Sequence, residues 1–356
     1  MSDLLPLLTG PAVWLASPGP HDGIVVSTRI RLARNCQGFA FRRKLSKQRQ
    51  RELVDHLMSA VSLLPALLSA THVRLDELDE VGRQALVERQ LVSRELANGK
   101  HPAGVSVSAD QVVSVMANEE DHLRLQVINA GLCVAANLEK AVAIDRELEA
   151  NLGWAWHERF GYLTACPTNV GTGMRASVML HLPALAETGE LKVALRGLAK
   201  LHMTVRGLHG EGSEPTGHYF QVSNQRSLGL TEQAIAEQIT ETVQRLVTYE
   251  QLARQSLFER SRWRLEDKVF RAWGILTHAR SLTSEELANE QSWIRLGAAT
   301  GVLEWRNWQV LDRLFLSCQP AHLQLLHADA EDAMSRDRLR ADLVRRAFTA
   351  PASDHN

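Results

Sequence analysis

The sequence predicts an α+β fold in which helices flank an antiparallel sheet, followed by an all-helical C-terminal domain. Residues 111–117 and 122–128 have the composition of strands, and only the four residues 118–121 separate them. Two strands joined by so tight a turn run antiparallel. The second domain is predicted because strand patterns disappear at about residue 255, whereas helical spacing continues to about 349.

The N-terminal residues 1–22 are rich in Pro and Gly and predict an irregular arm. Residues 23–32 (GIVVSTRIRL) alternate and predict a strand that presents Arg29 and Arg31 on one face. A strand of this kind is often a solvated edge. Two arginines two residues apart can also grip consecutive phosphates, so the local pattern leaves both interpretations open.

Two helices are expected next. Residues 46–64 carry apolar residues at helical spacing after Ser46, which suits an N-cap, and end near Pro65. Residues 76–97 predict a second helix. The turn-rich stretch 98–110 predicts a loop, which is either a flexible substrate-side segment or a simple connector.

The strand 122–128 presents His122, Arg124 and Gln126 on one face. If pairing extends back into the turn, Glu120 lies on the side of Arg124, and a carboxylate and a guanidinium project together where the strand starts. One interpretation is a local salt bridge, and the other is part of a functional site.

The stretch 161–185 (GYLTACPTNVGTGMRASVMLHLPAL) places Cys166, Gly171, Gly173 and Arg175 directly before or at the start of an apolar strand. Glycines allow a backbone to approach a ligand closely. A thiol and a cation are thus carried by a loop on a rigid scaffold, as functional residues usually are.

The remaining elements of this half are two helices (138–152 and 190–200), two strands (202–206 and 219–222) and a long helix that Thr231 caps, with apolar residues at helical spacing from Ile235 to Leu246 or Val247. The loop 207–217 carries Glu211 between glycines. Such a loop is expected to close over a ligand or else to be a solvated hairpin tip.

The C-terminal region contains a capping box at residues 283–286. Five of the eight tryptophans lie here, and we interpret them as core or dimer interface: Trp263, Trp273, Trp293, Trp305 and Trp308.

Composition limits the function. The apolar fraction of 45% and the charged fraction of 23% are those of a globular protein, and 356 residues suffice for two domains. A net charge of −1 gives no argument for a nucleic-acid partner. No apolar run approaches the roughly 18 residues that span a bilayer. The four cysteines lack the spacing of a disulfide framework or a metal site, so a reducing cytoplasm is expected.

The candidate anion-binding residues lie on strands or at their ends: Arg29, Arg31, Arg124, Arg175 and Arg206. The candidate carboxylates are Glu120 and Glu211, with Cys166 nearby. P-loop and protein-kinase motifs are absent from the sequence. Phosphoryl transfer requires mainly alignment and charge neutralisation, which arginines can supply. A guanidinium acceptor, with a pKa above ~12, would be clamped by two carboxylates, one of which draws off a proton.

Five segments resemble the ATP:guanido phosphotransferase family, in its order and roughly its spacing: STRIRLARN (27–35), NEEDHLRLQ (118–126), CPTNVGTGMRASVMLHLP (166–183), VRGLHGEGSE (205–214) and QVSNQRSLGLTE (221–232). One departure is Gln90, within VERQLVS (87–93), where the family pattern leads us to expect histidine.

Within the family, the chain most resembles the bacterial branch that phosphorylates arginine residues of proteins. The enzymes that act on free creatine or arginine carry a separate N-terminal helical domain, whereas the arginine strand here begins at residue 27. WGILTHARSLTSEE (273–286) is similar to the bacterial branch, and RDRLRA (336–341) matches its RDxxRA motif for phosphoarginine.

The resemblance implies roles for the candidate residues. The five arginines would hold the phosphates of ATP, which carries Mg²⁺. Glu120 and Glu211 would bind and activate the acceptor guanidinium beside the Cys166 thiol, and Met179 stands where the small-guanidine kinases carry a histidine near the adenine.

The C-terminal region has its own implied site. Arg336 and Arg340 stand at i and i+4 on a helix, beside Asp337, and would grip a phosphoarginine.

The implied organisation is a catalytic domain over 23–254 and a helical domain over 255–350 that dimerises and senses phosphoarginine. Substrates would be proteins with accessible arginines, either marked for a Clp-type protease or inactivated as repressors, and an activator protein would be a further partner. Two alternatives are a kinase of a small free guanidino compound and a phosphoarginine-binding adaptor in which catalysis is secondary.

Overall fold

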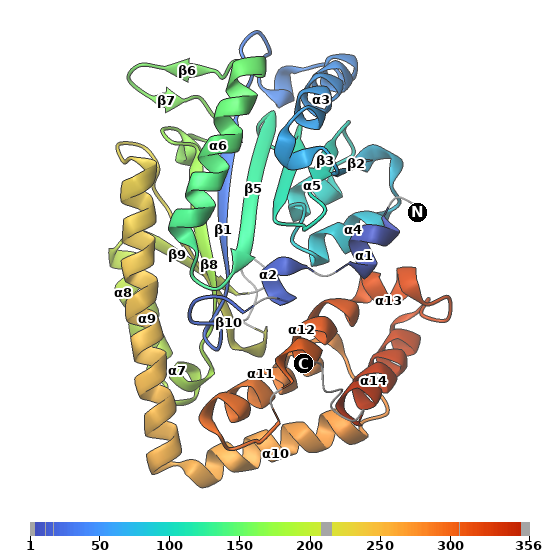
Figure 1. Ribbon diagram of the computed structural model, residues 1–356, viewed down its shortest axis with the longest axis vertical. Coiled ribbons are helices and arrows are strands. Elements are labelled where there is room, and N and C mark those ends of the chain that lie inside the picture. Colours follow the sequence, from blue (N-terminus) through green and yellow to red (C-terminus); the bar gives the residue numbers. More distant parts are fainter. Residues whose placement is uncertain (1–3, 11, 17, 208–215, 306, 350–356) are drawn as a thin grey trace.

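Figure 1 shows the computed structural model, which describes residues 4–10, 12–16, 18–207, 216–305 and 307–349. Eight strands of the described chain form one sheet in the order β2-β3-β4-β5-β1-β8-β10-β9. Each neighbouring pair is antiparallel. Helices flank this sheet, and a helical layer formed by the C-terminal part packs below it (Figure 1). The predicted fold class is confirmed.

The central strand of the sheet is β1 (Val25–Arg34), which pairs with β5 (Leu123–Ala130) and β8 (Met174–His181). The interpretation of this strand as a solvated edge is therefore wrong. The other strands are β2 (Thr71–Arg74), β3 (Gly104–Val107), β4 (Val113–Ala117), β9 (Met203–Gly207) and β10 (Tyr219–Asn224), and a separate hairpin joins β6 (Trp156–His157) to β7 (Gly161–Tyr162).

Several helices begin where their caps predict. The Ser46 hydroxyl accepts from the N–H of Arg49 at the start of α3, and the Thr231 hydroxyl accepts from the N–H of Ala234 at the start of α9. Each such cap is worth about 1 kcal/mol. The longer chain segments between and after the strands of the sheet contain the helices α3 (Lys47–Ser62), α6 (Val134–Leu152), α7 (Pro183–Glu187), α8 (Leu191–Lys200) and α9 (Glu232–Arg260).

Tertiary packing overrides the local pattern at the N-terminus. The expected irregular arm contains two short helices, α1 (Leu5–Thr9) and α2 (Val13–Ala16). Trp14 is fully buried against Ile128 and Met179, which lie on β5 and β8. Burial of so large an aromatic side chain orders a segment whose Pro and Gly content alone predicts no structure.

The region 76–110 also differs from the expectation. The predicted single helix is divided into α4 (Glu80–Glu88) and α5 (Arg94–Asn98), because Gln90 between them has a φ of 61°. The predicted loop contains the strand β3, whose four residues are all buried. Pairing with β2 and β4 stabilises this strand, and such non-local pairing leaves little trace in a short sequence.

The two faces of the sheet differ in chemistry. Ile30 and Leu32 of β1 point into the main core, where they meet apolar residues of α3, α6 and α9 such as Leu57 and Ile239. Full burial of each such side chain contributes roughly 1.5–3 kcal/mol. The alternating residues of β1, Arg29 and Arg31, therefore face the other side of the sheet.

The C-terminal helices are α10 (Arg262–His278), α11 (Ser284–Thr300), α12 (Trp308–Ser317), α13 (Pro320–Leu326) and α14 (Ala333–Thr349). Thr283 caps α11 as predicted, accepting from the N–H of Glu286. Trp273 and Trp305 pack on Phe348 with centroid distances of 5.5 and 4.8 Å, so these two tryptophans belong to the core of this layer. Trp263 is 68% exposed.

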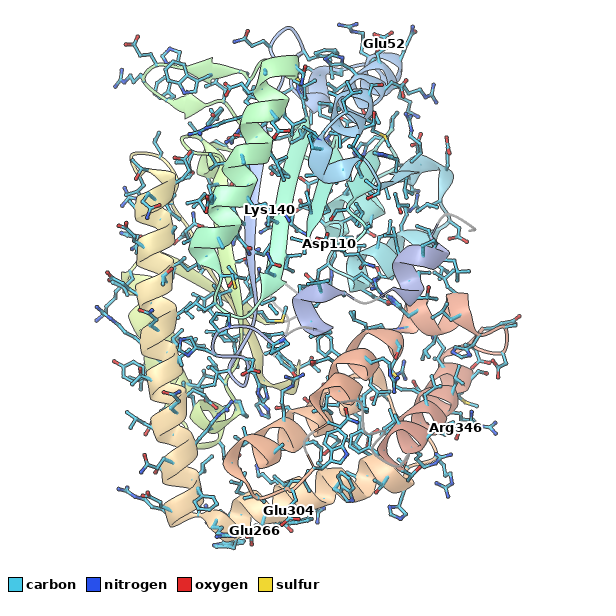
Figure 2. The ribbon with its side chains drawn as sticks, in the orientation of Figure 1. Glu52, Asp110, Lys140, Glu266, Glu304 and Arg346 are labelled. Atoms are coloured by element: carbon cyan, nitrogen blue, oxygen red, sulfur yellow. The ribbon has the colours of Figure 1, made fainter. Side chains whose placement is uncertain are left out.

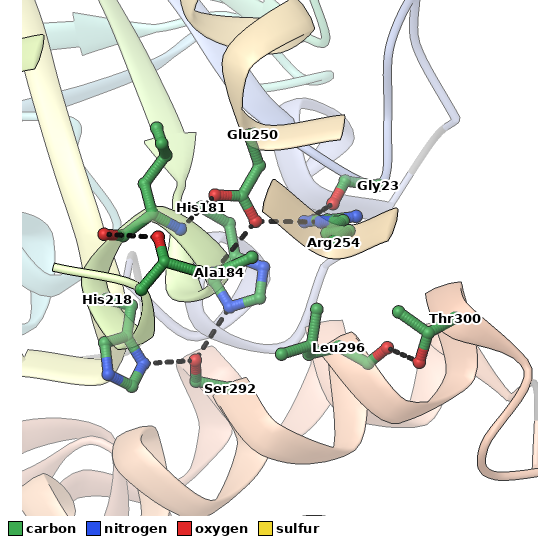
Figure 3. Close-up of polar contacts among 11 residues, drawn as sticks. Gly23, His181, Ala184, His218, Glu250, Arg254, Ser292, Leu296 and Thr300 are labelled. Atoms are coloured by element: carbon green, nitrogen blue, oxygen red, sulfur yellow. Dashed lines mark hydrogen bonds and ion pairs between the residues drawn. The ribbon is translucent and has the colours of Figure 1, made fainter. Parts of the chain in front are cut away.

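A serine joins the helical layer to the sheet. The Ser292 hydroxyl of α11 lies 2.8 Å from His181 Nε2 at the end of β8 and 2.8 Å from His218 Nδ1 (Figure 3). Burial lowers the pKa of both histidines, which favours neutral rings. A hydroxyl between two neutral rings can donate to one and accept from the other.

The outer surface carries charged side chains such as Glu52, Lys140 and Arg346 (Figure 2). None of the helices in the described ranges combines the length and apolar character needed to cross a membrane.

Candidate active site

A pocket of about 790 Å³ lies on the arginine face of the sheet. It is lined by all five predicted anion-binding arginines and by Glu120 and Cys166. These residues come from β1, β5, β8, β9 and two loops, so the structure brings together groups that are as much as 177 positions apart, Arg29 and Arg206. Glu211 lies outside the described residues.

Strand register explains why the arginines converge. Arg31 of β1 stands opposite Arg175 of β8 and opposite Gln126 of β5. Residues directly opposite each other in antiparallel strands share a face of the sheet. By the same rule Arg124 and Arg206 lie on this face, through the pairs of β5 with β1 and of β9 with β10.

Neutral side chains hold several of these guanidinium groups. Arg29 donates from Nη1 to Gln90 Oε1 at 3.0 Å and from Nε to Ser177 Oγ at 3.4 Å. Arg175 donates from Nη2 to Ser223 Oγ at 2.9 Å. Neutral acceptors such as Gln90 and Ser177 orient the Arg29 guanidinium without cancelling its charge.

The carboxylate that pairs with Arg124 is Glu119 and not Glu120, at 2.5 Å. The interpretation of Glu120 and Arg124 as a local salt bridge is therefore wrong, although both residues line the pocket. Asn118 has a φ of 62°, and the turn buries Glu119, which also accepts from Ser93 Oγ at 2.6 Å. Glu120 is only half-buried and lines the pocket.

The pocket has a strongly positive interior. Burial, followed by repulsion from Arg175 and Arg124, lowers the pKa of Arg29 to about 10. Burial, followed by repulsion from Arg29, Arg124 and Arg175, lowers the pKa of Arg31 well below its ordinary range. The Nε of Arg31 is buried with no hydrogen-bond partner. A half-buried guanidinium that lacks a partner at one donor is the arrangement expected for a site that receives an oxyanion.

Glu120 has the opposite electrostatic character. Burial, and then the neighbouring carboxylates of Asp121 and Glu119, raise the pKa of Glu120, whereas Arg124 opposes the rise. A carboxylate whose pKa is raised toward neutrality accepts a proton more readily than an ordinary glutamate.

The loop around Cys166 is anchored to the turn that carries Glu120. Asp121 Oδ1 accepts from the N–H of Ala165 at 2.6 Å and from Asn35 Nδ2 at 2.7 Å. The Cys166 Sγ lies 3.0 Å from Thr168 Oγ1. Asp121 thus links the candidate thiol to the candidate carboxylate.

Gly173 fixes the close approach of this loop to β1. Its φ is 62°, and a Cβ atom there would lie 2.6 Å from the carbonyl oxygen of Ala33. A larger residue at this position is excluded by both conformation and space.

Several residues of the site could not be recognised directly from local sequence patterns. Ser177, Ser223 and Gln90 orient arginines, and Gln90 stood out only as a departure from a family pattern. Phe315 and Gln319 come from the C-terminal layer and line the same pocket. No local pattern could predict them, because they approach from another part of the chain.

The predicted C-terminal clamp differs from the expectation. Arg340 is 1% exposed and donates from Nε to the carbonyl oxygen of Cys318 at 2.8 Å and from Nη1 to that of Leu282 at 2.7 Å. It also contacts Asp337 at 2.5 Å. Arg336 is half-buried and donates to the carbonyl oxygen of Glu331 at 2.7 Å. Arg340 therefore joins three segments of the helical layer and does not form an open pair with Arg336.

Residues 52–253 match the sequence model of the ATP:guanido phosphotransferase C-terminal catalytic domain. The chain belongs to the ATP:guanido phosphotransferase family. Residues 262–356 match the protein-arginine kinase McsB C-terminal domain. The combination of both domains places the chain in the protein-arginine kinase branch of the family.

Whole-length relatives agree with this assignment. The chain is 40% identical over 344 residues to the protein-arginine kinase of Desulforamulus reducens, covering 96% of each chain. It is 42% identical over 335 residues to that of Moorella thermoacetica, covering 93% of this chain and 96% of the relative.

Solved structures of other guanido kinases share the fold. A duplicated taurocyamine kinase from Schistosoma mansoni, with bound transition-state-analogue components, matches with a TM-score of 0.60 and 28% identity, over 67% of this chain and 34% of that one. A lombricine kinase matches with a TM-score of 0.58 and 23% identity, over 66% and 68% of the two chains.

Proposed function

We propose that this chain transfers the γ-phosphoryl group of ATP to arginine side chains of proteins. The observation that carries the proposal is the single pocket that combines five guanidinium groups with Glu120 and Cys166. Five cations suit a polyphosphate, which arrives with its Mg²⁺, and a carboxylate at the same pocket suits a cationic acceptor.

The chemistry assigns a separate task to each group. The arginines hold the phosphates in line for transfer and neutralise the charge that accumulates on the leaving ADP. Glu120 binds the acceptor guanidinium and takes a proton as its nitrogen attacks phosphorus. A nitrogen–phosphorus bond forms, and the bond to the β-phosphate oxygen breaks.

Two further residues complete the proposed acceptor site. The family resemblance assigns Glu211 as the second carboxylate. The Cys166 thiol lines the pocket and would orient the same guanidinium.

The cellular role is proposed from the family. The chain would act in the cytoplasm, as a homodimer, in protein quality control, and would mark proteins for a Clp-type protease under the influence of an activator. Of the two arginines that match the RDxxRA motif, the half-buried Arg336 is better placed to meet a phosphoarginine, since Arg340 is buried.

The decisive experiment incubates the protein with ATP, Mg²⁺ and an arginine-rich protein and measures acid-labile phosphate bound to nitrogen. We expect Glu120→Gln to lower kcat by about 100-fold or more, with ATP affinity nearly unchanged. The control is Glu147→Gln, an exposed carboxylate on α6.

Two results would contradict the proposal. Faster phosphorylation of free arginine than of the protein would favour a kinase of small guanidino compounds. Full cellular function of the Glu120→Gln variant would favour an adaptor in which catalysis is secondary.

A further inference from the structure

The C-terminal layer supplies one wall of the arginine pocket. Phe315 at the end of α12, Gln319 between the helices and Pro320 at the start of α13 line the same pocket as Arg29 and Arg175. We propose that the docked C-terminal domain is part of the nucleotide-binding site and that Glu88 is the positioning residue that holds it there. This inference rests on the proposed function only in taking the arginine pocket as the nucleotide site.

Glu88, at the end of α4, binds the start of α13 through three hydrogen bonds. Its Oε1 accepts from the N–H of Ala321 at 2.9 Å, and its Oε2 accepts from the N–H of His322 at 3.1 Å and from His322 Nδ1 at 2.7 Å. The two side chains are 5% and 0% exposed. This contact joins positions 88 and 322 in the interior, where loss of one partner leaves the other without a substitute from water.

The contacts place a proton on one nitrogen of the His322 ring. An ionised carboxylate only accepts hydrogen bonds, so the proton lies on Nδ1. The other ring nitrogen, Nε2, is buried without a hydrogen-bond partner. Glu88 therefore fixes both the backbone and the side chain of His322.

The residues that follow Glu88 extend this contact to the pocket. Arg89 donates to the carbonyl oxygens of Leu8 at 2.9 Å and Gly10 at 2.6 Å, in the N-terminal arm. Gln90 accepts from Arg29 through its side chain at 3.0 Å and adopts a φ of 61°. Three consecutive residues thus hold the C-terminal domain, the N-terminal arm and an anion-binding arginine.

Strain makes this segment sensitive to displacement. A non-glycine residue keeps a positive φ only where its surroundings hold it. Gln90 is held on one side by Arg29 and on the other by Gln126, which donates to its carbonyl oxygen at 2.6 Å. Movement of Glu88 with α13 would therefore be transmitted to the arginine.

The C-terminal wall also has the chemistry that a nucleotide needs beyond its phosphates. Phe315 packs edge-on against Tyr219 of β10 at 5.6 Å and joins the apolar cluster that contains Met179 of β8. Apolar and aromatic surface of this kind suits a nucleobase and ribose, whereas the arginines suit the phosphates. Domain docking and nucleotide binding should consequently strengthen one another to the same degree.

The test measures ATP affinity and domain docking in the full chain carrying Glu88→Gln. Isothermal titration gives the Kd of ATP, and hydrogen exchange of residues 319–326 reports docking. Couplings between two sites are commonly about 5- to 150-fold, and we expect about tenfold weaker ATP binding together with faster exchange. Saturating ATP should slow exchange of the same segment in the native chain.

Two further variants complete the design. Glu80→Gln, an exposed position on the same helix, should leave both measurements unchanged. His322→Leu removes the donor that faces Glu88 while keeping the site filled. It should weaken ATP binding and speed the exchange of residues 319–326, and it serves as the test variant if Glu88→Gln fails to fold.

Three outcomes would overturn the inference: faster exchange with unchanged ATP affinity, unchanged values of both, or weaker affinity with unchanged exchange, since the last would mean that Glu88 acts without the domain. Native protein that binds ATP with this coupling but phosphorylates no protein would refute the proposed function and leave the inference standing.

Discussion

Replacing Arg29 by methionine should stabilise the nucleotide-free protein while impairing its binding of ATP. Arg29 is half-buried among cations, and the side chains that accept its hydrogen bonds, Gln90 and Ser177, are neutral. The folded chain therefore pays for a charge that becomes useful only when an anion arrives. Methionine keeps much of the volume of the side chain and removes the charge.

The magnitude follows from the pKa. Burial and the neighbouring arginines lower the pKa of Arg29 to about 10, and each pKa unit corresponds to about 1.4 kcal/mol, so holding this group charged costs about 3 kcal/mol. The cost is complete at every pH below about 10 and declines as the pH rises from there toward the ordinary pKa of arginine. Loss of the hydrogen bond to Gln90 removes about 1 kcal/mol. The net expectation is a gain of about 2 kcal/mol at pH 7.

Urea denaturation with and without ATP would test this expectation. Without ATP, Arg29→Met should unfold at higher urea than the native chain. With ATP at about 100 times its Kd, the native chain gains about 2.7 kcal/mol of unfolding free energy. The native chain should then unfold at higher urea than Arg29→Met. Arg146→Met, an exposed arginine on α6, should change stability by less than about 0.5 kcal/mol. A nucleotide-free variant less stable than the native chain would refute the reasoning.

Three further predictions concern other parts of the molecule. Burial and two neighbouring carboxylates raise the pKa of Glu120. As the pH decreases, kcat/KM should therefore begin to fall at a higher pH than it would with an ordinary glutamate. The Glu120→Gln variant should lack this acidic fall in kcat/KM, and a variant with the same pH profile as the native chain would exclude the assignment. Asp145→Asn leaves the buried Arg34, 2.7 Å away, without its charge partner, and should cost about 3–5 kcal/mol of unfolding free energy; a cost below about 1 kcal/mol would show that the pair is dispensable. Arg340→Ala should lower the thermal midpoint by several degrees, because this side chain joins three segments, whereas Arg336→Ala should spare the midpoint and weaken phosphoarginine-peptide binding; equal midpoints would argue against this division of roles.

Local chemistry determined much of this protein from the sequence alone. Alternation along residues 23–32 put Arg29 and Arg31 on one face, and the structure confirms that they line one pocket. Helix caps at Ser46 and Thr231 are also where the sequence predicts them. These features depend on residues only two to four positions apart, so a single sequence contains them completely.

Only the tertiary structure decided which neighbour takes which role. Glu119 and Glu120 are adjacent, yet the turn buries the first against Arg124 and leaves the second at the pocket. Arg340 belongs to the RDxxRA motif, but its guanidinium donates to backbone carbonyl oxygens of the C-terminal helical layer. The contact of Glu88 with α13 joins positions more than two hundred residues apart. In each case the role of a side chain depends on which groups from distant parts of the chain lie beside it. The sequence near that side chain does not contain this information, because packing of the whole chain determines it.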